Sequence, residues 1–236
     1  MPERVQLFTT CLGELVFPEA VEDAAALLLA AGFEVETPRG QVCCGQPAFN
    51  SGHRDAARRV ARTFTRAFSR EVPIVCPSGS CATMAAHYLP ELVGCEPFDV
   101  HELSSFLDGR GAEPAPVNEG RVVAYHDSCH MLRELRISDA PRRLLERSGA
   151  VVRPLERPDL CCGFGGTFSV RQPEVSVAMA DDKLGSAGVV DALVSADPGC
   201  LMHLGGRRER TGAGPPLVHI ATALARGVAA APSVAA

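Results

Sequence analysis

A cysteine motif that is written twice constrains this chain more than any other feature. Cys43-Cys44-Gly45 recurs as Cys161-Cys162-Gly163, 118 residues later. Helix or sheet packing does not require cysteine at regularly repeated positions, so the pattern predicts a duplicated unit with one thiol site in each half. The flanking single cysteines keep the same spacing to within one residue: Cys11 with Cys129, and Cys81 with Cys200.

Each cysteine of this frame follows a segment that is predicted to be a strand. Strands are expected at residues 5–9, 33–37, 74–75, 122–126, 150–153 and 192–195, and helices from residue 18 and at 54–68, 81–87, 140–148 and 174–184. This order predicts an α/β fold of two duplicated Rossmann-like units with parallel sheets. Because ligands bind at the carboxyl ends of parallel strands, we expect the cysteine sites there.

The repeat also predicts how the chain is divided. We expect a first cysteine-rich domain at residues 1–107 and a second at 121–227. Residues 108–120 contain three Gly and two Pro without an apolar period, which is typical of a linker. The Ala-rich residues 228–236 are expected to form a flexible tail.

Composition and charge exclude several classes of function. The chain has 236 residues and a formal net charge of −5, so nucleic acid is not an expected partner. The longest apolar run, residues 24–31, is far too short to cross a bilayer, and the N-terminus lacks the apolar region of a signal peptide. We therefore expect a cytoplasmic protein without direct membrane insertion. In that compartment, ten cysteines indicate metal or redox chemistry more than disulfides.

Three interpretations compete for the two sets of four thiols. Buried cysteines without a ligand explain single positions but not two matched sets. A structural zinc site also uses four thiolates, although such sites usually combine two close cysteine pairs. An iron–sulfur cluster in each half fits best, because cysteine-only ligation suits it and clusters do not demand one fixed spacing. The expected ligands are Cys11, Cys43, Cys44 and Cys81 in the first half, and Cys129, Cys161, Cys162 and Cys200 in the second.

The arrangement resembles a known cysteine-rich family. A Cys, a Cys-Cys-Gly about thirty residues later and a further Cys, all present twice, are similar to the CCG domain shared by the cysteine-rich subunit of heterodisulfide reductase and the glycolate oxidase iron–sulfur subunit. Within that group the chain most resembles the lactate-utilisation protein A family, in residues 43–52, 77–81 and 161–170. The resemblance implies a cytoplasmic subunit that oxidises L-lactate to pyruvate together with iron–sulfur and accessory subunits, with another 2-hydroxy acid as the alternative substrate.

One departure from the heterodisulfide reductase pattern bears on the cluster type. That pattern closes each unit with Cys-x-x-Cys, whereas this chain has Ser78 and Asp197 at the first of these positions. Four thiolates per half therefore favour one [4Fe-4S] cubane in each half, with zinc at one site as the alternative. Cys76 lies near the first set and is a possible fifth ligand, while Cys95 is expected to be structural.

The candidates for catalysis are weaker than those for metal binding. His126, His130 and Arg133 flank Cys129 and are candidates for proton transfer or for binding a substrate carboxylate, although strand-end histidines more often have structural roles. A nicotinamide fingerprint is missing, so electron transfer within a multi-protein oxidoreductase is the favoured function. The rivals are a heterodisulfide-reductase-type thiol/disulfide oxidoreductase subunit, a glycolate oxidase iron–sulfur subunit and a zinc-stabilised interaction scaffold.

Overall fold

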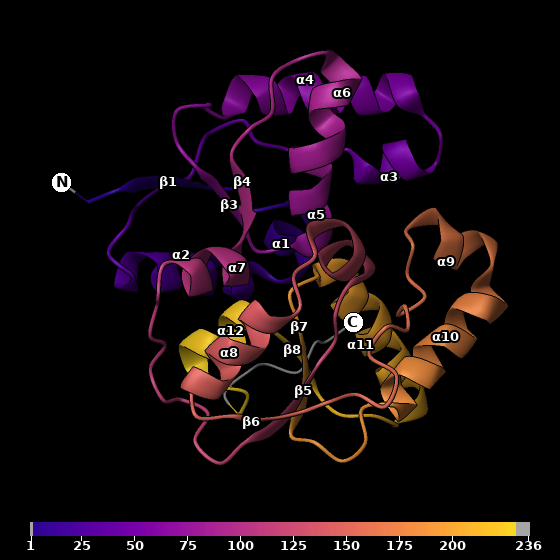
Figure 1. The fold of residues 1–236 in the computed structure, drawn as a ribbon. Helices are drawn as coiled ribbons and strands as arrows, with labels where there is room; N and C mark the ends of the chain where they lie inside the picture. The colour runs from indigo at the N-terminus through magenta and orange to yellow at the C-terminus, as the bar shows by residue number, and fades with distance from the viewer. Residues whose placement is uncertain (1, 230–236) are drawn as a thin grey trace.

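Each half of the chain builds its own four-stranded sheet with helices around it (Figure 1). The structure, a computed structural model, describes residues 2–229. The first half contains β1 (Arg4–Leu7), α1 (Cys11–Val16), α2 (Pro18–Ala30), β2 (Glu34–Glu36), α3 (Gln46–Asn50), α4 (Arg54–Ala67), β3 (Ile74–Cys76), α5 (Gly79–Thr83), the π-helix η1 (Met84–Tyr88), α6 (Leu89–Val93), β4 (Val100–Glu102) and α7 (Leu103–Gly109). The second contains β5 (Val122–Tyr125), the π-helix η2 (His130–Leu135), α8 (Asp139–Arg147), β6 (Val151–Arg153), α9 (Thr167–Arg171), α10 (Pro173–Gly185), β7 (Ala192–Ser195), α11 (Pro198–Thr211), β8 (Leu217–His219) and α12 (Ile220–Arg226).

The two sheets have the same topology. Their strand orders are β2-β1-β3-β4 and β6-β5-β7-β8, and every pair of neighbouring strands is parallel. The central strands β3 and β7 are buried at every residue, because helices cover both faces of a parallel sheet. The predicted α/β fold of two duplicated parallel-sheet units is confirmed.

Two edge strands were not expected from the sequence. β4 and β8 have three residues each, and no Gly or Pro separates either strand from the helix that follows it. Each runs directly into a helix that its last residue caps. A Glu102 carboxylate oxygen accepts the N–H groups of Ser104 and Ser105, and His219 Nδ1 accepts the N–H of Ala221. Short strand and helix therefore form one unit in each half.

The halves pack against each other through reciprocal pairs of helices. α2 of the first half lies on α12 of the second, and α7 of the first half lies on α8 of the second (Figure 1). Likewise α5 contacts η2, and α1 contacts α11. One apolar core runs through both halves and includes Leu28, Val75, Tyr125 and Leu224. The duplicated units therefore share a core.

The segment between the halves is anchored to the second half by a buried side chain. Asn118 Nδ2 donates to Ser148 Oγ at 2.9 Å and to the Ala223 carbonyl at 2.7 Å. Its Oδ1 accepts the N–H of Val228 at 2.9 Å. Most of the expected flexible tail, residues 230–236, lies outside the described residues. The domain boundaries given above stay predictions.

Candidate functional site

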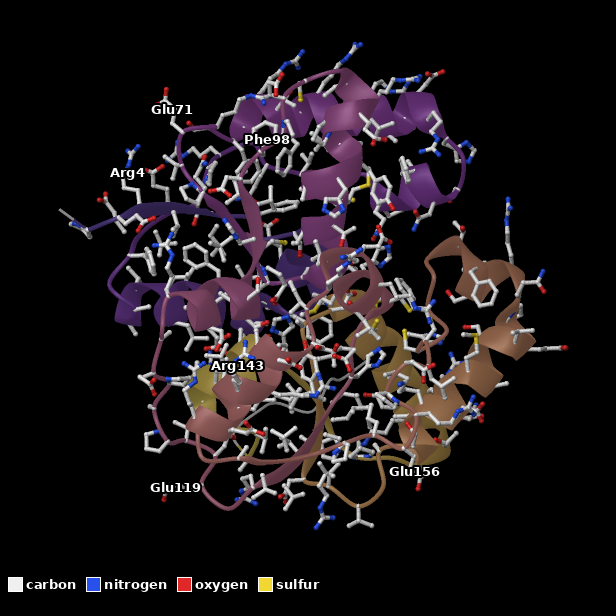
Figure 2. All side chains as sticks on the ribbon, in the orientation of Figure 1. Arg4, Glu71, Phe98, Glu119, Arg143 and Glu156 are labelled. Atoms are coloured by element: carbon white, nitrogen blue, oxygen red, sulfur yellow. The ribbon has the colours of Figure 1, made fainter. Side chains whose placement is uncertain are left out.

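Each set of four cysteines lies at the carboxyl edge of its own sheet. Cys11 opens α1 after β1, the pair Cys43-Cys44 follows β2, and Cys81 lies in α5 after β3. The second set follows β5, β6 and β7 in the same way: Cys129, Cys161, Cys162 and Cys200. Figure 2 shows several sulfur atoms near the middle of the molecule, away from the labelled Arg4, Glu71, Glu119 and Glu156 at its edge. The fold thus brings together thiols that are far apart in the sequence.

The thiols of each set contact one another in the same order. Neighbouring thiols shift one another's pKa in the order Cys11 and Cys43, Cys43 and Cys44, and Cys44 and Cys81, which places them side by side. The second set repeats this chain of contacts with Cys129, Cys161, Cys162 and Cys200. Two sites of the same construction therefore exist in one chain.

The glycine of each Cys-Cys-Gly motif shapes the turn that presents the first cysteine. Gly45 and Gly163 have left-handed φ values of 90° and 91°, a conformation that favours glycine. Their N–H groups donate to the sulfur of Cys43 and of Cys161, both at 3.4 Å. A Cβ at Gly163 would also lie 2.5 Å from the Ser176 carbonyl oxygen. Both turns therefore favour glycine, and Gly163 is also required for the close packing behind its turn.

The protonation of the thiols indicates that a full set of thiolates needs a bound cation. Hydrogen bonding within the set lowers the pKa of Cys43 to about 3, and Cys11 makes the largest contribution. In the second set, hydrogen bonding to which Cys129 contributes most lowers the pKa of Cys161 to about 2. Hydrogen bonding to the Cys43 thiolate raises the pKa of its neighbour Cys44. Because like charges repel at this range, the thiols of one set ionise together only when a metal supplies positive charge.

The donor set fits an iron–sulfur cluster. Each half offers four sulfur atoms, two on buried and two on partly exposed cysteines. Cys11, Cys81 and Cys200 lie in the first turns of α1, α5 and α11, where the positive end of a helix stabilises an anionic group. Cysteine thiolates are the usual ligands of [4Fe-4S] clusters, and four of them also suit tetrahedral zinc.

Comparison with known proteins gives the family. A model of the CCG cysteine-rich domain matches residues 5–85 and again residues 123–205. The chain is 37% identical over 241 residues to Lactate utilization protein A 2 of Bacillus cereus (strain Q1), covering 95% of this chain and 99% of the relative. It is 40% identical over 234 residues to Lactate utilization protein A of Shouchella clausii (strain KSM-K16), covering 93% and 98%. The chain belongs to the lactate utilisation protein A family.

Two further comparisons concern the shape and the membrane. The chain was compared with a solved ABC transporter solute-binding protein from Conexibacter woesei DSM 14684. The alignment covers 98% of this family member and 74% of the solute-binding protein, at 15% identity. Its TM-score of 0.27 is too low to carry an argument. Among residues 2–229, this lactate utilisation protein A family member has no helix of the length and apolar character that a membrane crossing needs.

The positions of the missing fifth cysteines are helix caps in this member of the family. Ser78 Oγ accepts the N–H of Cys81 at 3.4 Å at the start of α5. Asp197 Oδ1 accepts the N–H of Gly199 at 3.1 Å at the start of α11, and its Oδ2 accepts the N–H of Ser80 from the other half at 2.9 Å. These side chains hold the two cysteine-bearing helices in place and link the halves.

The extra cysteines have different surroundings. Cys76 ends β3, is fully buried, and its thiol donates to the Ser78 carbonyl at 3.5 Å. Burial and the nearby Cys81 raise its pKa, so the thiol stays protonated. Cys95 packs at the edge of the apolar cluster around Phe64. A ligand role for Cys76 and a structural role for Cys95 stay predictions.

The three candidate catalytic residues point to different partners. His126 is buried, and a ring nitrogen lies within 4.8 Å of the sulfur atoms of Cys162 and Cys200. Burial lowers the pKa of His126 to about 3, so its ring is neutral. His130 Nε2 lies 2.9 Å from Gln46 Nε2 of the first half. Arg133 donates to the Asp159 carbonyl at 3.2 Å. Each of the three candidates therefore has a contact of its own, and their catalytic roles stay predictions.

The sequence did not identify Lys183 as a residue of the second site. Its side chain is buried, near enough to Cys162 and Cys129 for their charges to act on its pKa, and Nζ donates to the carbonyls of Arg157 and Pro158 at 3.0 and 3.3 Å. Burial lowers its pKa. Its position on the face of α10 that also buries Ala180 and Leu184 is the pattern that would have revealed it. A buried cation near thiolates favours their charged form.

Proposed function

We propose that this protein acts in lactate utilisation, as the iron–sulfur electron-transfer subunit of a complex that oxidises L-lactate to pyruvate. The names of its relatives support the lactate role. The duplicated thiol set is the single observation that supports electron transfer, because it offers two equivalent centres in one chain. A heterodisulfide-type thiol chemistry is less favoured, since the fifth cysteine positions are occupied by Ser78 and Asp197, which act as helix caps.

In this proposal each set of cysteines holds one [4Fe-4S] cluster. When bound, such clusters accept and release single electrons. Two such centres would pass the two electrons that are removed from lactate one at a time. The chain's own residues hold the thiolates in place through the Cys-Cys-Gly turns, and they keep Cys44 and Cys162 away from water. In this proposal a partner subunit binds the substrate, since His126, His130 and Arg133 each contact a different group of this chain and nothing links them in a base-and-arginine pair.

The proposed partners are iron–sulfur and accessory subunits in the cytoplasm, without nucleic acid. The net charge of −5 argues against binding a polyanion. Arg58, Arg59, Arg62 and Arg66 form an exposed basic stripe on α4, a suitable docking face for an acidic partner.

Anaerobic purification tests the cofactor. We expect iron and acid-labile sulfide at about four each per site, as a cubane requires. Cys162→Ser should remove the visible absorption of one half, and Cys95→Ser, the matched control, should leave it intact. With the partner subunits added, lactate-dependent dye reduction should follow and should be lost in Cys162→Ser. Lactate turnover by the isolated cluster-loaded chain, or full activity of the complex without either cluster, would contradict the proposal.

A zinc-stabilised scaffold is the second candidate. One observation favours it, namely that His126, Cys162 and Cys200 place a nitrogen and two sulfur atoms within 4.8 Å of one another. Mixed nitrogen and sulfur donors are common at zinc. Stoichiometric zinc without sulfide in anaerobic material would support this candidate and remove the electron-transfer proposal.

A further inference from the structure

The two sites differ at one position of the repeat. His126 stands 118 residues after Phe8 and is its counterpart, since Cys129 is the counterpart of Cys11. Phe8 lies in an aromatic cluster with Phe64 and Phe68, at ring distances of 5.2 and 5.4 Å. The first half thus has an apolar ring where the second half has an imidazole beside the thiols.

The His126 ring is buried without a polar partner among the described residues. Its exposed fraction is 0%, and neither Nδ1 nor Nε2 has a hydrogen bond within residues 2–229. A neutral imidazole carries one N–H donor and one acceptor, and leaving both unpaired in the interior costs free energy. Buried polar side chains usually have partners, so this exception indicates one that the polypeptide does not supply.

The backbone fixes where this ring lies. The His126 N–H donates to the Val194 carbonyl at 2.8 Å, and the Ser195 hydroxyl donates to the His126 carbonyl at 3.0 Å. Both bonds tie the residue to β7, next to the helix that carries Cys200. Lys183, the nearby buried cation, directs Nζ toward two main-chain carbonyls. The ring therefore lies against the sulfur atoms of Cys162 and Cys200 in a restricted position.

The number of thiols decides what the imidazole can do there. Four cysteines supply one thiolate for each iron of a cubane, which leaves no iron for a nitrogen ligand. Sulfur atoms of a cluster and its thiolates accept hydrogen bonds, and such bonds stabilise the added negative charge of the reduced state. The ring N–H is the donor that such an acceptor needs.

We propose that His126 donates a hydrogen bond to a sulfur atom of the cluster held by the second set, and that this bond gives the second cluster a higher reduction potential than the same cluster would have without it. The inference rests on the proposed iron–sulfur function. It makes His126 a tuning residue for one centre only, because Phe8 has no donor to offer the other.

The test compares His126→Phe with the parent holoprotein, both purified anaerobically. This substitution copies the residue of the first half, and His130→Phe is the control, because that neighbouring histidine already has a partner in Gln46. Redox titration followed by paramagnetic resonance should show the second cluster reduced less readily in His126→Phe. We expect about a tenfold loss in its ratio of reduced to oxidised form at a fixed potential, which corresponds to 59 mV for one electron. The first cluster, identified by its loss in Cys44→Ser, should not change.

A second readout does not depend on the potential. In protein labelled with nitrogen-15 at histidine, the second cluster should show a weak nitrogen hyperfine coupling that His126→Gln abolishes and His130→Phe preserves. His126→Gln keeps an N–H donor and serves if His126→Phe fails to fold or to load. If both clusters are intact, the potential of the second cluster is unchanged and no such coupling is seen, the proposed hydrogen bond is refuted but the proposed iron–sulfur function is not. A strong coupling of the size given by iron-bound nitrogen would also refute it. Absence of iron and sulfide would instead remove the proposed function.

Discussion

Gly79 offers a direct test of how the two cysteine-bearing elements are packed together. It is the first residue of α5, two residues before Cys81, and α5 contacts η2, which follows Cys129. A methyl group at this position would overlap Met131 Cγ, lie 2.9 Å from its Sδ and lie 3.0 Å from Ser128 Oγ. Gly79→Ala should therefore push the two elements apart.

The magnitude follows from the surroundings of Met131. That side chain is fully buried, so it can move only by displacing its neighbours. Overpacking of this kind costs about 1–3 kcal/mol, and the reduced freedom of the unfolded chain offsets roughly 0.4–1 kcal/mol. We expect a net destabilisation of about 1–2 kcal/mol and a melting temperature lower by roughly 2–4 °C for each kcal/mol.

Urea and thermal unfolding of the metal-free chain, followed by circular dichroism, measure this effect. Gly206→Ala in α11 is the matched control, since a Cβ there meets nothing within 4 Å, and it should stabilise the chain by about 0.5–1 kcal/mol. Met131→Ala should cost less in the Gly79→Ala background than alone, because the two changes are coupled. Equal stability of Gly79→Ala and the parent would refute the packing argument, as would additive behaviour of the pair.

Three further changes test other parts of the structure. Asp197→Ala removes an acceptor from two N–H groups, of Gly199 and of Ser80, and should cost about 2–3 kcal/mol in urea unfolding, whereas an unchanged midpoint would show that the link between the halves is not made. Burial lowers the pKa of His219 to about 4 from 6.5, so the unfolded chain takes up this proton first as pH falls. Stability should drop by about 3 kcal/mol between those two values, and His219→Gln should flatten the slope; an equally steep slope would contradict it. Removal of the metal by chelation should lower the melting temperature, because metal binding to the folded state adds to its stability, and identical melting curves would argue against a bound centre.

Much of the fold was predictable from local patterns. The apolar runs that form β1, β3, β5 and β7 are bounded by turn residues, and the helices α2, α4, α8 and α10 carry apolar residues at helical spacing. The two cysteine sets could be placed at the strand ends because a parallel sheet brings those ends together. The edge strands β4 and β8 were not predicted, because each runs directly into a helix and no turn residue marks its end.

The finer structure of the site depends on contacts that the sequence does not encode locally. His126 and His130 are both close to Cys129 in the sequence, but one ring is buried against Cys162 and the other contacts Gln46. Asn118 lies in a segment rich in Gly and Pro that looked like a linker, and its partners are 30 and 105 residues away. Contacts between residues so far apart in the sequence are set by tertiary packing, which lies within the second half for His126 and Asn118 and between the halves for His130.

The reciprocal helix pairs carry a charge reversal with a consequence for assembly. Asp108 on α7 accepts hydrogen bonds from Arg143 on α8, which is labelled in Figure 2. The counterpart of Asp108, 118 residues later, is Arg226 on α12, and it donates to Asp23 on α2. A symmetric pair of two first halves would set Asp108 against Asp23, and a pair of two second halves would set Arg226 against Arg143. Like charges at those places disfavour both homodimers. After duplication, the two copies of the unit have thus become mutually selective partners.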